Sequence, residues 1–145
     1  MAKTKPHIAK GVKFISQELM GGGYHPFITV TIEGKKCRFL IDTGASKCVI
    51  DKDFYEKKLE RKMKVIKQET TGLHSTVMES YVGTLKKLQL GDLILTNYPI
   101  AGVELTHVNL TYGKMKIKKI HGILGSDIFQ NHNAIIDYAQ SKLFI

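Results

Sequence analysis

The chain has no Trp and only three Pro and two Cys in 145 residues, and it has fewer acidic residues (13) than basic ones (22). Without Trp, and without aromatic residues interleaved in the basic runs, it lacks the stacking platform of single-strand nucleic-acid binders. No apolar run reaches about eighteen residues, the length that a membrane-spanning helix needs. The basic start of the chain is not followed by the apolar segment of a secretory signal. We therefore expect a cytoplasmic protein that does not contact a membrane.

The two cysteines, Cys37 and Cys48, lie in apolar runs and form no Cys-x-x-Cys or Cys/His metal motif. This pattern predicts buried thiols, and a disulfide between them stays open as a second interpretation. The chain also lacks a Gly-rich phosphate loop, His-Glu-x-x-His and Gly-x-Ser-x-Gly. No metal and no cofactor are expected.

The formal charge of +9 is concentrated at the N-terminus and in segments 57–67 and 114–119. Such patches can bind nucleic acid or other anionic surfaces. Residues 114–118 alternate Lys with apolar residues, as a strand with one solvated face does. We interpret the basic runs as solvated surface in preference to a nucleic-acid site.

The length and an apolar content of 43% predict a single domain with a sizeable core. Residues 1–22 are expected to form an N-terminal arm with a first strand over 12–19, and residues 23–145 the domain proper. Further strands are predicted over 27–32, 37–41, 49–50, 63–68, 77–82, 84–90, 93–103, 120–124, 134–138 and 142–145. Short helices are predicted after Asp51 and over 127–131, whereas 106–119 is open between a helical turn and strand with loop. The chain is thus mainly β.

One carboxylate stands out, because the apolar run Phe39-Leu40-Ile41 ends abruptly in Asp42-Thr43-Gly44. An acid at the end of a buried strand loses hydration unless hydrogen-bond donors compensate it. Gly44 allows the backbone N–H to approach, and the Thr43 hydroxyl can brace the turn. By itself this pattern is also typical of a strand followed by an Asx-turn.

A second apolar run, Ile120 to Leu124, is broken by Gly125 and followed by a helix start at Ser126 or Asp127. The two stretches together, over about 27–145, resemble the retropepsin-like aspartic peptidases, and among these the single-domain bacterial members. The hairpin, strand, loop and helix around Asp42 recur weakly around Gly125, in line with the pseudo-twofold design of that family.

The resemblance implies a closed acid-protease β-barrel with one or two short helices and a mobile flap hairpin over 63–82. It implies catalytic roles for Asp42, Thr43 and Gly44. The substrate-binding residues that it implies are Ala45, Ser46, Thr71, Gly72, Leu73, His74, Ile123 and Leu124. On the residues alone, the flap segment is equally typical of a plain surface hairpin.

Aspartic peptide hydrolysis needs two carboxylates that share a proton, and this chain has one Asp-Thr-Gly. Asp137 also follows two isoleucines, but it lacks the Thr-Gly turn and is expected to be an exposed strand residue. The resemblance therefore implies a homodimer formed through the Asp42 loop and the terminal strands, with 143–145 as an unpaired end strand.

Viral members commonly carry Asp at the position of Ser46 and Arg at that of Ser126, and these two residues form an ion pair. Here both are Ser, so neither charge is left buried without its partner. The leading hypothesis is an aspartic endopeptidase acting on peptide or protein substrates. The alternative is a catalytically inactive retropepsin-like domain that only binds peptides or proteins.

Overall fold

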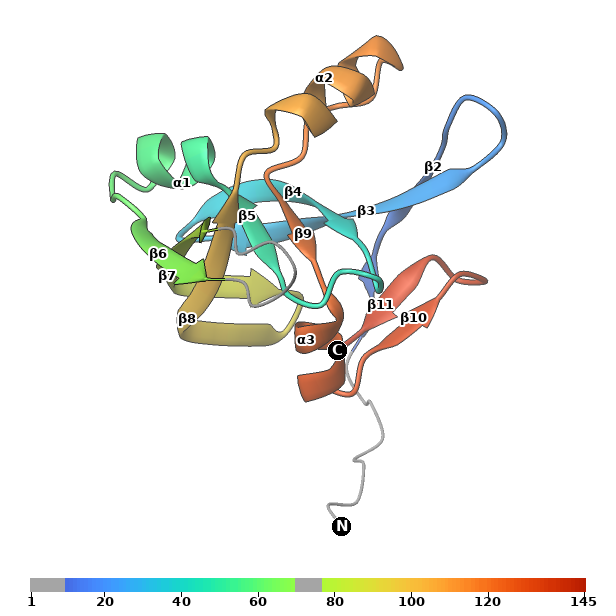
Figure 1. Ribbon diagram of the computed structural model, residues 1–145. Helices are drawn as coiled ribbons and strands as arrows, with labels where there is room; N and C mark the ends of the chain where they lie inside the picture. The colour runs from blue at the N-terminus through green and yellow to red at the C-terminus, as the bar shows by residue number, and fades with distance from the viewer. Residues whose placement is uncertain (1–9, 70–76) are drawn as a thin grey trace.

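The computed structural model describes residues 10–69 and 77–145, and these are mainly β-strand (Figure 1). The strands and helices are, in chain order, β1 (Val12–Lys13), β2 (Ile15–Glu18), β3 (Tyr24–Ile32), β4 (Lys35–Ile41), β5 (Val49–Asp51), α1 (Lys52–Lys58), β6 (Lys64–Glu69), β7 (Val77–Leu90), β8 (Leu93–Val103), α2 (Thr106–Lys114), β9 (Gly122–Leu124), α3 (Ser126–Asn131), β10 (Ile135–Asp137) and β11 (Lys142–Phe144). No helix in these ranges is long and apolar enough to span a bilayer.

The main sheet closes on itself to form a barrel. Its strand order is β2-β3-β4-β9-β5-β8-β7-β6, and β3 also pairs with β7. The ring therefore contains the six strands β3, β4, β9, β5, β8 and β7, with β2 and β6 attached outside it. This closure confirms the predicted acid-protease barrel and removes most of the free strand edges of the sheet.

The β3–β4 hairpin confirms the predicted pair of strands and delivers the chain to Asp42. The two strands pair in register from Phe27↔Leu40 to Ile32↔Lys35. Glu33 and Gly34 form the turn with φ of 48° and 83°, the left-handed values that a tight hairpin turn requires. Alternate residues of both strands fill the barrel, so the period of two in the sequence is the cause of this element.

Strand β7 is one continuous strand, whereas the sequence predicted two strands separated at Gly83. Along its length β7 changes partner, from Lys64↔Val82 on β6 to Ile32↔Leu88 on β3. Gly83 does not break the strand, because its small size serves packing: a Cβ there would lie 2.6 Å from Tyr55 Cζ. Gly inside a strand often marks such a close approach.

The helices follow the predicted signals in two cases out of three. Asp51 caps α1 as predicted, with its side chain accepting a hydrogen bond from the Phe54 N–H. Helix α3 begins at Ser126, one of the two predicted starts. Segment 106–119, for which the sequence did not decide between helix and strand, contains the helix α2. This helix has no side-chain cap and is held instead by Tyr112, a buried residue. Packing rather than a local signal therefore determines α2.

Two corrections concern the ends of the chain. The single strand predicted over 12–19 is interrupted at Phe14, whose side chain turns into the core and is 1% exposed. On either side of it, β1 pairs with β11 and β2 pairs with β3. Strand β11 lies between β1 and β10, so the terminal strand expected to be unpaired is paired on both sides. The free edges of this small sheet belong to β1 and β10.

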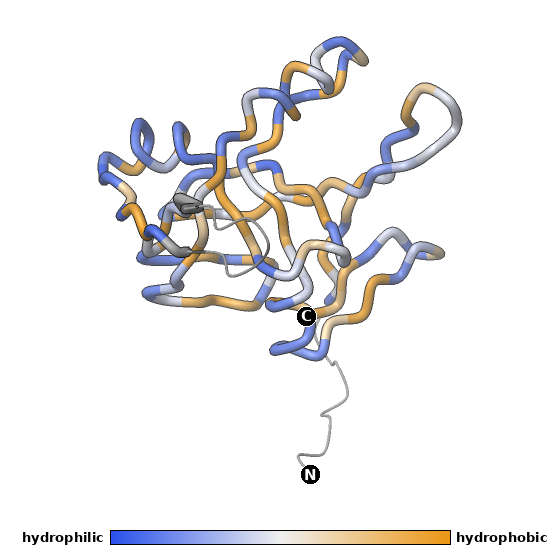
Figure 2. The backbone as a smooth tube through the Cα atoms, viewed as in Figure 1, coloured by the Kyte–Doolittle hydropathy of each residue, from blue (hydrophilic) through white to orange (hydrophobic). Residues whose placement is uncertain are grey.

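The buried apolar residues form two clusters. The larger one fills the barrel and includes Phe39, Ile41 and Leu124. The smaller one lies between the outer face of β3, β4 and β9 and the α2 region, and contains Phe27, Leu105, Tyr112, Ile117 and Ile120, with Leu40 and Ile123 packed against it. Figure 2 shows the apolar residues along the barrel strands and the hydrophilic ones at α1 and at the turns.

Candidate active site

Asp42 follows directly after β4, beside the end of β9. Strands β4 and β9 are parallel and pair Ile41 with Leu124. The Asp42 N–H donates to the Leu124 carbonyl oxygen at 3.0 Å, which continues the ladder by one step. Because side chains alternate along a strand, Asp42 is directed to the same face as Leu40, away from the barrel core that holds Ile41. The carboxylate is half-buried.

The residues after Asp42 fold back onto it. The Gly44 N–H donates to Asp42 Oδ1 at 3.0 Å, and the Ala45 N–H donates to the Asp42 carbonyl oxygen at 3.1 Å. A Cβ on residue 44 would lie 3.2 Å from Oδ1, closer than most such contacts. Gly44 thus supplies the hydrogen-bond donor expected from the sequence, because its backbone can lie close to the Asp42 carboxylate.

The loop is supported by the turn between β9 and α3. The Ser126 N–H donates to the Ala45 carbonyl oxygen at 2.7 Å. A Cβ on Gly125 would lie 2.7 Å from the backbone of both Ala45 and Lys47. Only glycine lets the two segments approach this closely. The two sequence motifs therefore meet in space, as the resemblance implied.

Asp127 anchors the far end of the loop, a role that sequence reasoning missed. Its carboxylate accepts from the Cys48 N–H at 3.0 Å to Oδ1 and 3.1 Å to Oδ2, and from Cys48 Sγ at 3.1 Å. The Gly125 N–H donates to Cys48 Sγ at 3.3 Å. A local signal existed, namely an acid in the first turn of a predicted helix, but its partner is 79 residues away.

Burial makes Cys48 an unreactive thiol. Its pKa is raised to about 12, mainly by desolvation and also by the hydrogen bond to Asp127. The neighbouring Tyr98 phenol also has its pKa raised, first by burial and then by Cys48 and Asp127. The second cysteine, Cys37, is buried too, and burial raises its pKa to about 11. Both cysteines are free, which confirms the prediction of buried thiols and excludes the disulfide.

A cavity of about 500 Å³ opens beside Asp42. Thr43 and Leu40 line it on the loop side. Residues from the start of β3, from β10 and from the position after β10 complete it: Tyr24, His25, Pro26, Ile136 and Tyr138. The His25 Nδ1 atom is held 2.8 Å from the Tyr112 hydroxyl of α2. These residues were not predicted, because contacts between the two ends of the chain and α2 leave no local signal.

The other predicted site residues lie in different surroundings. Thr43 and Ser46 are exposed, Ala45 is half-buried, and Ile123 is half-buried beside Leu40. Leu124 is the exception, because its side chain is 0% exposed in the barrel core, where a substrate cannot touch it. Its contribution is the carbonyl that holds Asp42. The predicted flap residues Thr71, Gly72, Leu73 and His74 lie outside the described residues.

Among the described residues that line the cavity, Asp42 supplies the single carboxylate. Asp137 ends β10 and accepts hydrogen bonds from the Gln140 N–H and side chain, so it stabilises a turn instead. Across residues 10–69 and 77–145, no three His, Cys, Asp or Glu side chains gather as metal ligands. The chemistry available is therefore that of one carboxylate held at the end of a rigid strand.

A family model described as aspartyl protease matches residues 28–128, which include both the Asp42 loop and the Gly125 turn. The chain belongs to the aspartyl protease family. A search of curated protein sequences finds no significant match to it. Membership in the aspartyl protease family agrees with the closed barrel and with the pairing of the two motifs.

Solved structures show that the fold is retropepsin-like. The chain is similar to a retropepsin-like aspartic protease from Rickettsia conorii, with a TM-score of 0.55, 20% identity and coverage of 92% of this chain and 87% of that one. It is also similar to the retroviral protease-like domain of Ddi1 from Leishmania major, with a TM-score of 0.52, 16% identity and coverage of 82% of this chain and 86% of that one. A third match is EIAV protease in complex with the inhibitor HBY-793, with a TM-score of 0.51, 17% identity and coverage of 85% of this chain and 99% of that one.

Proposed function

We propose that this aspartyl protease family member is an aspartic endopeptidase that works as a homodimer, with one Asp42 from each chain. The observation that carries the proposal is the position of Asp42: its Oδ1 is fixed by the Gly44 N–H, and the carboxylate borders a cavity of about 500 Å³. A half-buried acid held on a rigid strand end and open to a cavity is suited to proton transfer with a bound substrate.

The proposed reaction uses two Asp42 carboxylates that share one proton, because two like charges about 3 Å apart do not both ionise. The ionised carboxylate takes a proton from a water molecule, whose oxygen attacks the peptide carbonyl carbon. The protonated carboxyl group gives its proton to the carbonyl oxygen, and a gem-diol forms. The carboxyl group that took the proton of water then gives a proton to the amide nitrogen, while the ionised carboxylate takes a proton from a gem-diol hydroxyl. The C–N bond breaks, a carboxylic acid and an amine leave, and the two carboxylates again share one proton.

The partner chain is required because one chain supplies one carboxylate to the cavity. A twofold axis next to the Asp42 loop would place two identical loops face to face. Thr43 is exposed at this surface and its hydroxyl is available to the partner loop. The free edge of β10 offers a second contact, next to Ile135 and Tyr138, which are 53% and 61% exposed. We therefore assign the dimer contact that was expected at the terminal strand to β10, because β11 is already paired on both sides.

The substrate is proposed to lie as an extended peptide along the Asp42 cavity. Leu40 forms part of the apolar wall of this cavity, and Ile123 is its neighbour on β9. The Ser126 N–H already holds the Ala45 carbonyl, so the loop is braced without the Asp–Arg ion pair of viral members. The role of 71–74 as a cover over the peptide stays a prediction.

The test is cleavage of a mixed peptide library by the full chain across about pH 3 to 8, with oligomeric state measured by analytical ultracentrifugation in the same buffers. We expect cleavage where a dimer is present, none by Asp42→Asn, and blockage by a non-cleavable mimic of the gem-diol. A chain that stays monomeric at high concentration and cleaves nothing would contradict the proposal. That outcome would instead support the inactive peptide-binding domain.

A further inference from the structure

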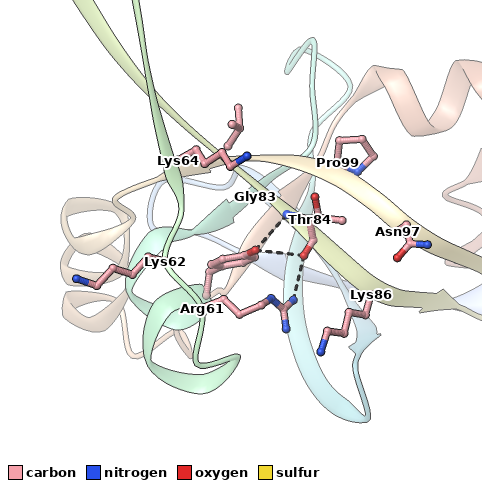
Figure 3. A pocket seen from close by; sticks show the side chains of 10 residues that line it. Arg61, Lys62, Lys64, Gly83, Thr84, Lys86, Asn97 and Pro99 are labelled. Atoms are coloured by element: carbon pink, nitrogen blue, oxygen red, sulfur yellow. Dashed lines mark hydrogen bonds between the residues drawn. The ribbon is translucent and has the colours of Figure 1, made fainter.

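A second cavity, of about 510 Å³, lies at the base of the β6–β7 hairpin (Figure 3). Four of its ten lining residues are cationic and none is acidic: Arg61, Lys62, Lys64 and Lys86. They come from the segment after α1, the first residue of β6, and the middle of β7. None of the lining residues belongs to the Asp42 loop or to the cavity beside it. The two sites are therefore separate.

One of the four cations has an acidic partner. The Arg61 Nη1 and Nη2 atoms donate to the two carboxylate oxygens of Glu33 in a bidentate pair, and the Lys86 N–H donates to the same carboxylate at 3.0 Å. Arg61 Nη2 also donates to the Thr84 carbonyl oxygen at 2.9 Å. These bonds hold Arg61 in place as one wall of the cavity, and they neutralise a single charge.

The three lysines form no direct ion pair with the described residues, although Lys86 lies within electrostatic reach of Glu33 and Lys62 within reach of Glu56. Lys62, Lys64 and Lys86 are exposed, and none of them forms an ion pair within the described part of the chain. Each ammonium group carries three donors on a flexible stem. The lining residues of the cavity thus carry four positive charges and no negative one, and Glu33 pairs with one of the four.

We propose that this basic pocket, defined by Arg61, Lys62, Lys64 and Lys86, is a docking site for an acidic segment of a polypeptide. The charges are complementary, because in this concave site carboxylates of the ligand would replace the counterions of three lysines that form no direct ion pair with the described residues. Thr84 and Asn97 at the rim add uncharged polar groups.

Two features favour a polypeptide over a nucleic acid. The aromatic residue of the pocket, Tyr55, is 3% exposed, and its hydroxyl exchanges hydrogen bonds with the Thr84 backbone, so no ring face is free to stack on a base. Strand β6 is the outer strand of the main sheet and pairs with β7 alone among the described strands. An extended peptide can therefore add to the edge of β6 that no described strand covers, near Lys64 in the pocket.

The pocket deepens the proposed peptidase function, and its catalytic consequence depends on that function. Because it is separate from Asp42, occupation of the pocket holds a substrate at a distance from the bond that is cleaved. Binding energy of this kind is the same in the ground state and the transition state, so it lowers KM and leaves kcat unchanged. We expect the effect only for substrates that carry Asp or Glu outside the cleaved segment.

Direct binding is the first test, because it does not need catalysis. The probe is a fluorescein-labelled decapeptide of Glu, with a Gln decapeptide as the uncharged probe, measured by anisotropy with the full chain at low salt. The pocket variant is Lys62→Ala/Lys64→Ala/Lys86→Ala. The matched control, Lys114→Ala/Lys118→Ala/Lys119→Ala, removes the same charge from three exposed lysines elsewhere. Arg61 is left intact because it is bonded to Glu33.

We expect the pocket variant to bind the Glu peptide at least about tenfold more weakly, with less than about a twofold change in the control variant. Equal losses in both variants would show nonspecific attraction and overturn the proposal. So would no preference for Glu over Gln, or tighter pocket-dependent binding of a single-stranded oligonucleotide.

A second arm uses cleavage. With a cleavable peptide that carries a Glu-rich extension, the pocket variant should raise KM by a similar factor at unchanged kcat. Asp42→Asn should bind the labelled Glu peptide as well as wild type does. Binding without cleavage by wild type would contradict the peptidase proposal alone, whereas cleavage without a KM difference would contradict the docking proposal alone.

Discussion

The two halves of the barrel repeat one arrangement but end differently. In the first half the β3–β4 hairpin leads to a strand end that carries Asp42, followed by β5 and α1. In the second half the β7–β8 hairpin leads to β9, whose end carries Gly125, followed by α3. The parallel pairing of Ile41 with Leu124 places these two strand ends side by side.

The ends of β4 and β9 make different contributions to the site. The first end supplies a carboxylate, and the second end supplies a glycine and the N–H groups that hold the loop. The second half could not carry its own acid at this point, because a Cβ at position 125 would meet the backbone of the first half. A single chain therefore builds a support around one acid, and in the proposed mechanism the second acid comes from another copy.

The sharpest way to test this comparison is to remove the acid of the first half. Asp42→Asn should reduce peptide cleavage by at least about a thousandfold, because the dyad loses its ability to hold and move the shared proton. The free energy of unfolding should change by less than about 1 kcal/mol, since the Asn oxygen can still accept from the Gly44 N–H. Cleavage assays and urea denaturation measure the two effects.

The same variant also tests whether two chains share the site. Asp42→Asn mixed with wild type in equal amounts should leave about one quarter of the wild-type activity per total dimer, because only one random dimer in four has two acids. Activity that falls to one half would show that each chain works alone.

The next largest effect is expected at the glycine of the second half. Gly125→Ala should lower the free energy of unfolding by about 2 to 4 kcal/mol, because the new Cβ would lie 2.7 Å from backbone atoms that cannot move aside easily. Gly113→Ala is the control, since nothing lies within 4 Å of a Cβ there and α2 gains a better helix former. Equal losses in both variants would show that Gly125 is not needed for close packing.

The sequence predicted the elements that local chemistry specifies. Alternating residues predicted the β3–β4 hairpin, the Asp51 cap predicted α1, and the two motifs predicted the meeting of Asp42 with Gly125. Each of these rests on residues close together in the chain or on a motif pair.

The parts that the sequence did not predict depend on contacts between distant segments. Strand β7 passes through Gly83 because Tyr55 packs there, and α2 is helical because Tyr112 has a buried site. The Asp127–Cys48 contact and the cavity walls from β3 and β10 arise only when the barrel closes. Periodicity does not report such contacts, so these parts of the Asp42 surroundings became visible only in the structure.

A smaller effect should follow when the anchor of the second half is weakened. Asp127→Asn should cost about 1 to 3 kcal/mol in the free energy of unfolding, because the charge-assisted hydrogen bonds from Cys48 lose strength. Cys48 should also react faster with a thiol reagent in the native state. Asp137→Asn, which alters a turn at the surface, is the matched control and should cost less than about 1 kcal/mol. A Cys48 reaction rate equal to that of wild type would contradict the anchoring role.

The smallest effect is expected at the turns of the two hairpins, which differ in their support. Glu33 in the first turn is bonded to Arg61, whereas Asp92 in the second turn is exposed. The Arg61 hydrogen bond lowers the pKa of Glu33 below its ordinary value of 4.5. The stabilisation is therefore present above the pKa of the unfolded chain and is lost as pH falls through the lower pKa of the folded chain.

Glu33→Gln should accordingly cost about 1 kcal/mol at neutral pH, because the pair is partly exposed to solvent, and less in acid. Asp92→Asn should have no measurable effect at either pH. Urea denaturation of the three proteins at neutral and at acidic pH measures this difference. If Glu33→Gln cost as much in acid as at neutral pH, the charge of Glu33 would not stabilise the first turn, and the two hairpins would differ only in their packing.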